Sequence, residues 1–577
     1  MSALLIRRRP VPDVSGWPDA VHPVLRRVYA ARGVTDIAQV SHRLGGLLPP
    51  TRLGGLDRAV ALLLEAIARD LHICVIGDFD CDGATGTAVA VRGLRLLGAR
   101  RVSYRVPHRM RHGYGLSPAL VADLADLSPD LLLTVDNGIA CVAGVAAARE
   151  AGMRVIVTDH HLPGAQLPQA DAIVNPNLHG DGFPSKALAG VGVMFYLLLA
   201  LRAQMRAQGA FAQGRREPDL AALLDLVALG TVADMVPLDE NNRILVTAGL
   251  KRLRAGVAQA GLRALMQVAG RVPERIGSAD LGFALGPRIN AAGRLEDMAL
   301  GIECLLADDE ATALRLAAQL DAINRERRDL QDQMLQQAEA MAASCIATIE
   351  AGDGGEAALC VFDADWHPGV VGLVASRLKE RVHRPTVAFA PGGEDGLLRG
   401  SARSIPGFHI RDALADLAAA QPGLIARFGG HAMAAGLSLA PDALETFRAA
   451  FLVLAAERLD PAALRAELLS DGALAPQDLS RDLAEQLRDG GPWGQGFPEP
   501  VFDDEFTVAG WRVVGNNHLK LQLRHTASGV PIDAIHFGGY DGTPPASRLH
   551  LAYQLEPDDF RDRCGVQLLV RHRVDLP

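Results

Sequence analysis

The stretch Val75-Ile-Gly-Asp-Phe-Asp-Cys-Asp-Gly-Ala84 decides how the first half of this chain is expected to fold. Its first two residues end the run Leu71 to Ile76, which is almost continuously apolar and therefore typical of a strand buried on both faces. It leads into Ala84 to Leu97, whose apolar residues have helical spacing. The stretch thus predicts a buried strand, a turn and a helix, which is the repeating unit of an α/β domain.

The turn itself is acidic, because Asp78, Asp80 and Asp82 fall within five residues. Such carboxylates repel one another strongly unless protons or cations neutralise them. Hard divalent ions such as Mg2+ and Mn2+ bind carboxylate oxygens and would neutralise them. A solvated acidic turn, or a chance likeness to a calcium loop, explains the three residues equally well on their own.

Two later stretches favour the metal interpretation. Leu131 to Val135 is a second buried-strand pattern that ends in Asp136-Asn137-Gly138, and Val155 to Thr158 is a third that ends in Asp159-His160-His161. In an open parallel sheet the carboxyl ends of the strands lie side by side, and ligands bind in the crevice outside them. A lone histidine is more often structural, and His161 could be a supporting partner. With carboxylates from two neighbouring strands beside it, His160 is better explained as a metal ligand.

Composition places the chain among globular proteins. It has 577 residues, 49% of them hydrophobic and 22% charged, which predicts three or four domains and excludes a fibre or a disordered chain. No secretory apolar region follows the first arginines and no apolar run reaches the length of a membrane span, so we expect a cytoplasmic protein without membrane association. The seven cysteines lack Cys-x-x-Cys spacing and predict reduced thiols. The formal net charge of −9 gives no general affinity for nucleic acid, so any phosphate binding must be local.

Changes of pattern divide the chain into five parts. Strands alternate with helices after about residue 50, a long helical pattern with one apolar stripe runs through about 306–345, and the glycine-rich, acidic stretch 350–356 marks a boundary. Near the end, His518 to Arg524 alternates polar and apolar residues, as a half-exposed strand of a small β-barrel does. The expected parts are an N-terminal extension packed on the first domain (1–50), a doubly wound parallel α/β domain (51–305), a connecting helix (306–350), a smaller α/β domain (351–460) and a barrel domain (461–577).

Several further stretches carry groups that bind phosphate. Arg100 to Tyr114 holds five arginines, two histidines and two tyrosines; a solvated loop is the alternative, but arginine grips phosphate and tyrosine stacks on unpaired bases. Gly286 to Arg294 is expected as a loop of small residues that lets the backbone approach a ligand. Arg399 to Ser404 and Phe428 to Ala432 could be simple turns, or a surface that cradles a phosphate. Asp234 is a fourth candidate carboxylate, although an aspartate at a helix end is often only a cap.

Taken together, the acidic motifs resemble the four metal motifs of the DHH phosphoesterase superfamily. Gly429-Gly430-His431 is similar to the hallmark of the associated DHHA1 domain, and the expected barrel resembles the nucleic-acid-binding OB-fold of one branch. Motif order, chain length and the stretch Gly286 to Arg294 are similar to the branch of single-strand-specific 5′ to 3′ DNA exonucleases, over nearly the whole chain beyond about residue 50. The four motifs, in this order, are Asp78-x-Asp80-x-Asp82-Gly83, Val135-Asp136-Asn137-Gly138, Asp159-His160-His161 and Asp234.

The resemblance implies an α/β multidomain fold, with a DHH domain, a connecting helix, a DHHA1 domain and a C-terminal OB barrel. It also implies hydrolysis of single-stranded DNA from a 5′ end to mononucleotides, with two Mn2+ or Mg2+ ions, in DNA recombination and repair. Single-strand-binding protein and recombination helicases are the implied protein partners.

The resemblance also assigns roles to individual residues. As metal ligands it implies Asp80, Asp82, Asp136, His160 and Asp234, with Asp78 at a further motif position. Asp159 and His161 match motif positions as ligands or supporting groups of the catalytic site. Arg109, Ser401 and Arg403 are implied to hold the 5′-terminal phosphate, and Tyr114 to stack on a base. Arg288, Asn290 and His431 are implied to face the scissile phosphate.

Other functions use similar motifs. A pyrophosphatase, a cyclic-dinucleotide phosphodiesterase or an oligonucleotide phosphodiesterase of the superfamily would share the metal motifs but needs no OB barrel, so the last hundred or so residues discriminate. A nucleic-acid-binding module with an inactive metal site is the non-enzymatic alternative. Intact carboxylates in all four motifs argue against that alternative, and a cleavage assay with Mn2+ decides it.

Overall fold

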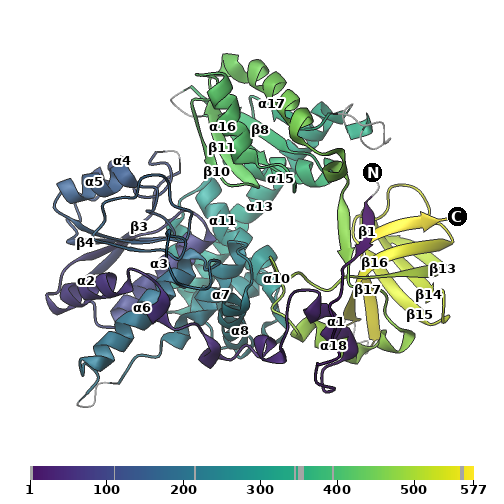
Figure 1. Cartoon of the computed structure of the whole chain (residues 1–577), viewed down its shortest axis with the longest axis horizontal. Helices are drawn as coiled ribbons and strands as arrows, with labels where there is room; N and C mark the ends of the chain where they lie inside the picture. The colour runs from purple at the N-terminus through teal and green to yellow at the C-terminus, as the bar shows by residue number, and fades with distance from the viewer. Residues whose placement is uncertain are drawn as a thin grey trace. The chain divides into compact units, whose positions relative to one another are not determined.

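The computed structural model describes residues 4–109, 111–212, 216–343, 346–348, 356–392, 396–558 and 565–577. The chain forms two compact units, and each contains segments from both halves of the sequence (Figure 1). The N-terminal unit consists of Val11–Asn324 and Ser480–Pro500, and the C-terminal unit of Met1–Pro10, Arg325–Leu479 and Val501–Pro577. None of the described helices is both long enough and apolar enough to cross a membrane.

The centre of the N-terminal unit is a five-stranded parallel sheet in the order β3-β2-β4-β5-β6. Its central strands are the predicted apolar runs, and every side chain of β2 and β4 is buried. The chain adds β3 on one side of β2 and then β4 on the other side, so the topological switch point of the sheet lies at the ends of β2 and β4. The strands are β2 (Ile73–Ile76), β3 (Val102–Arg105), β4 (Leu131–Val135), β5 (Arg154–Thr158) and β6 (Ala172–Val174).

Helices cover both faces of this sheet. The face that carries Cys74, Ile76 and Leu132 packs against α4 (Pro118–Ala122) and α5 (Val142–Glu150). The other helices that contact the strands are α2 (Leu56–Ala68), α3 (Cys81–Leu96) and α6 (Gly190–Ala207). The predicted doubly wound α/β domain is thereby confirmed.

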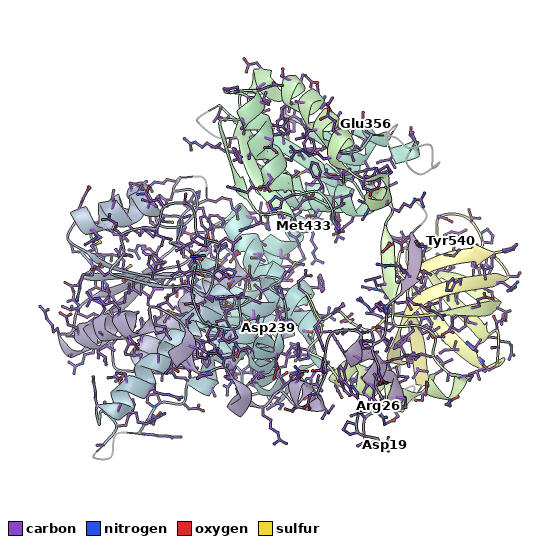
Figure 2. The ribbon with its side chains drawn as sticks, viewed as in Figure 1. Asp19, Arg26, Asp239, Glu356, Met433 and Tyr540 are labelled. Carbon is purple, nitrogen blue, oxygen red and sulfur yellow. The ribbon has the colours of Figure 1, made fainter. Side chains whose placement is uncertain are left out.

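The stretch Gly286 to Arg294 is helical and not the loop expected from its small residues, since it lies in α11 (Gly286–Leu295). The small residues serve close packing: a Cβ added to Gly293 would lie 2.0 Å from the carbonyl oxygen of Phe79. The helix therefore packs directly on the acidic turn. Apart from short 3-10 helices and α13 (Glu310–Met341), the remaining helices of this unit are α1 (Pro23–Ala30), α7 (Leu224–Ala233), α8 (Glu240–Arg254), α9 (Ala260–Val268), α10 (Ser278–Asp280), a π-helix (Leu281–Leu285), α12 (Ala299–Leu306) and α18 (Arg481–Asp489). Asp239 caps α8 (Figure 2).

The expected long helix is α13 (Glu310–Met341), which buries Leu316, Leu320 and Met334 of the predicted apolar stripe. Asn324, in this helix, is the last residue of its segment in the N-terminal unit, so α13 contributes to both units. The expected boundary at 350–356 lies outside the described residues, apart from Glu356.

The C-terminal unit contains a second sheet in the order β10-β11-β9-β8-β7, in which only β7 and β8 pair in parallel. Two stretches that could have been simple turns are mostly strands: Arg399 to Arg403 lies in β9, and Phe428 to Gly430 lies in β10. The elements are β7 (Leu359–Phe362), α15 (Val371–Val382), β8 (Thr386–Pro391), β9 (Leu398–Arg403), α16 (Ile410–Ala420), β10 (Arg427–Gly430), β11 (Ala434–Leu439) and α17 (Leu444–Arg458).

The last part of the chain forms a closed five-stranded barrel, as predicted, in the order β13-β14-β15-β17-β16. The alternation at its second strand is real, because Leu519, Leu521 and Leu523 are buried while residues between them are not. The strands are β13 (Phe502–Val514), β14 (His518–His525), β15 (Pro531–His536), β16 (Arg548–Asp558) and β17 (Gly565–Leu576).

The sequence led us to expect that the N-terminal extension packs on the first domain. This is wrong for its first residues. Strand β1 (Leu5–Arg8) pairs in parallel with β12 (Glu467–Ser470) of the C-terminal unit. A guanidinium nitrogen of Arg8 donates to a carboxylate oxygen of Asp503 at 2.9 Å, which ties this strand to the barrel. The helix α1 that follows belongs to the N-terminal unit.

Candidate metal centre

The acidic turn between β2 and α3 is shaped by its own hydrogen bonds. Helix α3 begins at Cys81 because Asp80 caps it, with Oδ1 accepting the backbone N–H of Gly83 at 3.0 Å. Asp82 therefore lies in the first turn of the helix, whereas the sequence placed it in the preceding turn. Its carboxylate accepts the N–H groups of Gly190 (2.6 Å) and Val191 (2.9 Å), which fixes the start of α6 against this turn.

The second motif follows β4 at the switch point of the sheet. Asp136 has a φ of +64°, a left-handed conformation that side chains other than glycine rarely adopt. Its neighbour Asn137 donates its amide to the carbonyl oxygens of Ile76 (3.0 Å) and Val135 (2.9 Å), and so joins the ends of β2 and β4. A Cβ added to Gly190 would lie 2.4 Å from that of Asp136, so α6 presses directly on this carboxylate. We did not predict roles for Asn137 and Gly190.

The third motif follows β5, and its residues have different roles: Asp159 supports its neighbours, and His160 is a candidate metal ligand. Asp159 accepts three hydrogen bonds at Oδ1, from the backbone of His160 (2.7 Å) and from the backbone (3.1 Å) and Nδ1 (2.7 Å) of His161. Its Oδ2 accepts the N–H of Ile139 at 2.9 Å. Burial alone would raise the pKa of Asp159, but the bonds from His161 and the backbone outweigh it and hold the pKa below its usual value. Asp159 thus orients both histidines as a permanent carboxylate.

The candidate ligands converge at one place. Nε2 of His160 lies 3.1 Å from a carboxylate oxygen of Asp136 and 3.5 Å from one of Asp234, which ends α7. Three overlapping groups have ligand atoms within 4.8 Å of one another: Asp136 with His160 and His161, Asp82 with His160 and Asp234, and Asp78 with Asp80 and Asp136. The structure therefore brings together the residues of all four motifs, from the ends of β2, β4 and β5 and from α7.

The electrostatics of this cluster call for cations. Burial, followed by repulsion from neighbouring carboxylates, raises the pKa of Asp78, Asp136 and Asp234 well above the usual range and that of Asp82 to about 7. Oδ1 of Asp78 is buried and accepts no hydrogen bond from the described residues. Carboxylate and imidazole groups grouped around a point of unbalanced negative charge fit hard divalent ions such as Mn2+ or Mg2+.

Two predicted substrate residues lie on the rim of the cluster. Arg109 places its guanidinium carbon 4.0 Å from the ring centroid of Phe79, the residue between Asp78 and Asp80, and donates to the carbonyl oxygen of Gly293 at 3.2 Å. Tyr114 donates its hydroxyl to the backbone oxygen of Asp136 at 3.0 Å. Tyr114 as a whole is 43% exposed, so part of it is accessible to a ligand.

Arg288 and Asn290 are both on α11 but have different surroundings. Asn290 accepts the backbone N–H of Cys81 at 2.7 Å, so it directly supports the acidic turn. Arg288 pairs with Asp321 of α13, at 2.9 Å from Nε and 2.8 Å from Nη2. Nothing in the sequence identified Asp321 as its partner.

The other predicted substrate residues belong to the C-terminal unit. Ser401 and Arg403 project from β9 toward the start of α15, where a Cβ on Gly372 would lie 3.2 Å from Oγ of Ser401 and 2.9 Å from Nη2 of Arg403. Nε of Arg403 donates to Ser376 at 3.1 Å, and burial lowers the pKa of the guanidinium. His431 is exposed, directly after β10.

Comparison with known proteins identifies the family. The models of three families match: the DHH family, N-terminal domain, over residues 72–231, the DHHA1 domain over 354–457 and the RecJ OB domain over 470–572. A protein of Dickeya dadantii, "Single-stranded-DNA-specific exonuclease RecJ", is 50% identical over 571 residues, which cover 98% of each chain. The chain belongs to the RecJ family. The protein of the same name from Escherichia coli is 48% identical over 98% of each chain.

Solved RecJ structures agree with this assignment. RecJ of Thermus thermophilus in complex with Mn2+ has a TM-score of 0.81 at 31% identity, covering 100% of this chain and 80% of that one. The Mg2+ complex of RecJ from the same organism has a TM-score of 0.76 at 29% identity, covering 100% and 79%. The expected DHH, DHHA1 and OB architecture is confirmed by these matches and by the closed C-terminal barrel.

Proposed function

We propose that this protein is a single-stranded-DNA-specific exonuclease that hydrolyses phosphodiester bonds with two divalent ions, Mn2+ or Mg2+. The observation that carries the proposal is full-length identity of 45–50% with relatives that bear this name. The cluster supports it independently, since it gathers the acidic and imidazole groups that a two-metal hydrolase needs. We further propose removal of mononucleotides from the 5′ end, as part of DNA recombination and repair.

The ions would be held by Asp78, Asp80, Asp82, Asp136, His160 and Asp234. When bound, such a pair of ions activates a water and stabilises the leaving oxygen. His161 is held by Asp159, and its Nδ1 lies 3.9 Å from a carboxylate oxygen of Asp136. At this position its imidazole can coordinate a metal ion or hold a proton. Asn290 keeps the acidic turn in register with α11, so the ligands remain preorganised.

The substrate would be held by residues with complementary charge and shape. On this proposal Arg109, Ser401 and Arg403 bind the 5′-terminal phosphate, and Tyr114 stacks on a base. Arg288, Asn290 and His431 act at the scissile phosphate, where positive charge and hydrogen-bond donors stabilise the transition state. The DHHA1 domain is suited to bind an anion here, because the side chains of Ser401 and Arg403 on β9 lie beside Gly372 in the first turn of α15. The backbone N–H groups at the start of a helix attract negative charge.

The barrel offers a surface for unpaired bases that the sequence did not single out. Trp511 is 41% exposed, and its ring is stacked with that of Tyr540, which Figure 2 labels, at a centroid distance of 6.0 Å and an interplanar angle of 27°. Phe537 is 63% exposed and packs edge-on against His518. Exposed aromatic rings bind successive bases of single strands with little sequence preference. This surface favours a polynucleotide substrate over pyrophosphate or a cyclic dinucleotide.

Three finer expectations stay part of the proposal. The domain limits 1–50, 51–305, 306–350, 351–460 and 461–577 are our functional division of the chain. Single-strand-binding protein and recombination helicases are proposed as partners, and the cytoplasm as the location. Co-purification with tagged chain from a bacterial lysate, with and without nuclease treatment, tests the partners.

A cleavage assay tests the proposed function. Oligonucleotides labelled at the 5′ or the 3′ end, single-stranded or in blunt duplex, are incubated with the full chain and Mn2+, Mg2+ or EDTA. We expect metal-dependent release of mononucleotides from the 5′ end of single strands only. Equal digestion of the duplex, or activity in EDTA, would overturn the proposal.

A further inference from the structure

The loop between β3 and α4, residues 106–117, carries both Arg109 and Tyr114. The described residues of this loop belong to neither a strand nor a helix, so its backbone is not fixed by a ladder of regular hydrogen bonds. Arg109 and Tyr114 reach the metal centre only if the loop keeps its present course. The side-chain contacts that hold the loop in this course therefore matter for function.

His112 joins the beginning of the turn to the end of α4. Its Nδ1 accepts the backbone N–H of His108 at 2.9 Å, and its Nε2 lies 3.0 Å from Oδ2 of Asp123, the residue that ends the helix. Because Nδ1 accepts, a neutral ring carries its proton on Nε2 and donates it to the carboxylate. Only 7% of the His112 side chain is exposed, against 35% for Asp123, so the pair is partly shielded from water.

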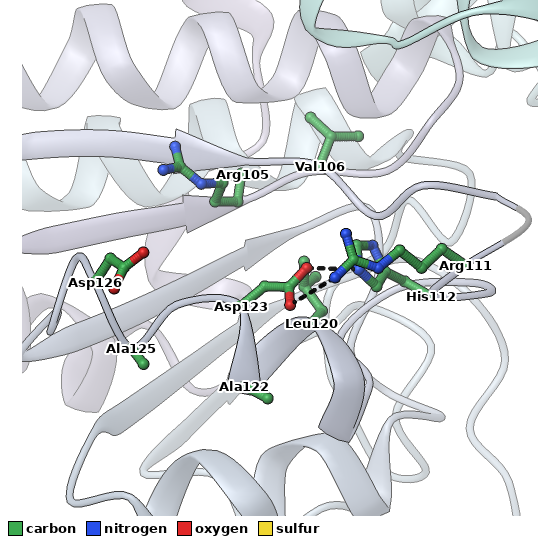
Figure 3. A pocket seen from close by; sticks show the side chains of 9 residues that line it. All are labelled: Arg105, Val106, Arg111, His112, Leu120, Ala122, Asp123, Ala125 and Asp126. Atoms are coloured by element: carbon green, nitrogen blue, oxygen red, sulfur yellow. Dashed lines mark hydrogen bonds and ion pairs between the residues drawn. The ribbon is translucent and has the colours of Figure 1, made fainter.

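Arg111 adds a second ion pair to the same carboxylate, at 3.1 Å, but 70% of its side chain is exposed. Exposed pairs of this kind contribute little to stability. Figure 3 shows both contacts to Asp123 as dashed lines, in a pocket that Arg105 and Asp126 also line. His112 is therefore the main link between the loop and α4.

We propose that His112 and Asp123 form a clamp that positions Arg109 and Tyr114 at the metal centre. The clamp rests on the proposed function, because it serves to bind the DNA end. Neither clamp residue is in the three groups that could hold an ion, so the clamp acts on the loop and not on the metal. Without it the loop samples other conformations, and the fraction of molecules ready to bind DNA falls. Apparent affinity falls by the same fraction, whereas the rate of the bound complex does not.

Four proteins test the clamp: wild type, Asp123→Ala, Asp123→Glu, which can still accept from His112, and the control Asp126→Ala in the same pocket. We expect Asp123→Ala to raise KM for a 5′-phosphorylated single strand by about tenfold while kcat changes less than about twofold. Hydrogen exchange of the backbone amides in 106–117 should become faster in the same variant. Asp123→Glu should recover part of both effects, and Asp126→Ala should match wild type.

The exchange measurement separates this proposal from the proposed function, since it needs no substrate. Wild-type exchange rates in Asp123→Ala would overturn the clamp, even in an active nuclease. So would a fall in kcat at unchanged KM, or equal effects of Asp126→Ala. If the wild-type protein failed to cleave single-stranded DNA while Asp123→Ala loosened the loop, the hold of His112 and Asp123 on the loop would stand, whereas the proposed function, and with it the role of the clamp in binding DNA, would fall.

Discussion

Nε2 of His160 lies 3.1 Å from a carboxylate oxygen of Asp136, although the two residues follow different strands, β5 and β4. The two strands pair in parallel, with Val135 opposite Thr158, so their carboxyl ends deliver these side chains to the same point. Asp159 holds the backbone of His160, and Gly190 of α6 presses on Asp136. The position of both groups is thus fixed by the sheet and its neighbours.

This arrangement separates activity from stability. We expect Asp136→Asn to lose hydrolysis by at least about a hundredfold, while the metal-free protein unfolds at the same temperature as wild type or a higher one. The reason is that burial and neighbouring carboxylates raise the pKa of Asp136, so its charge is unfavourable in the absence of cations. Stabilisation by saturating Mn2+, about 2.7 kcal/mol at a hundred times Kd, should shrink.

Thermal unfolding in EDTA and in Mn2+, together with cleavage of labelled single strands, measures these effects. Asp19→Ala is the matched control, because this carboxylate is fully exposed and pairs only at the surface with Arg26 at 3.2 Å (Figure 2). Near-normal turnover by Asp136→Asn, or by His160→Ala, would refute the metal assignment.

The ends of the strands, and the motifs that follow them, could be predicted from the sequence. Buried parallel strands are continuous apolar runs, and a change to polar residues marks where each run ends. It misjudged where α3 begins. The cap at Asp80 starts the helix at Cys81, whereas the apolar spacing becomes clear only later. Similarly, Gly286 to Arg294 looked like a loop, since the carbonyl of Phe79 that its glycine packs against comes from a distant part of the chain.

Contacts between residues that are far apart in the chain also could not be predicted from the sequence. Arg288 pairs with Asp321, and Asn290 supports Cys81, through the packing of α11 against other helices. A list of charged residues does not say which of them will meet. The same holds for Trp511 and Tyr540, which stack only because the barrel closes.

The exposed aromatic surface of the barrel should contribute to DNA affinity. Trp511→Ala should weaken binding of a long single strand by about 1–3 kcal/mol, the usual contribution of one stacked base, and leave duplex binding unchanged. Trp511→Phe should retain part of the affinity. Fluorescence anisotropy with labelled oligonucleotides measures this, and Val574→Ala, a comparably exposed apolar residue on β17, is the control. Unchanged affinity in Trp511→Ala would remove this surface from the binding site.

His42 should make the N-terminal unit sensitive to acid. Burial, and then the charge of Arg243, lowers the pKa of His42 to about 4, and Nε of Arg243 lies 3.3 Å from its Nε2. Between pH 6.5 and pH 4 the unfolded chain therefore binds a proton that the folded chain does not, so the free energy of unfolding falls as the pH falls, by at most about 1.4 kcal/mol per pH unit.

Replacement by asparagine isolates this effect, because asparagine tolerates the left-handed backbone of residue 42, where φ is +46°. The difference in the free energy of unfolding between wild type and His42→Asn should narrow steadily as the pH is lowered from 7 to 4. Urea unfolding at several pH values measures it. His536 in the barrel, whose pKa burial also lowers to about 4, titrates in both proteins and cancels in the difference. A difference that did not change with pH would show that His42 takes up its proton at the same pH in the folded and the unfolded protein, and would refute the lowered pKa.

The last prediction concerns the direction of digestion. An exonuclease acts from one end only if it recognises that end, and a terminal phosphate carries more charge than the phosphates within the strand. Arg403 is suited to this, since its guanidinium lies beside Ser401 at the start of α15 and is oriented by Ser376 at 3.1 Å. Arg403→Ala should therefore reduce cleavage of 5′-phosphorylated single strands about tenfold or more, and that of 5′-hydroxyl strands much less. Arg403→Lys should restore only part of the preference, because lysine supplies charge without the planar fork. Arg411→Ala, an exposed arginine on α16, is the control and should keep the wild-type ratio. Steady-state rates on the two substrates decide the matter: loss of both activities by one factor, or digestion by the wild-type protein from the 3′ end, would refute a role for Arg403 in selecting the 5′ end.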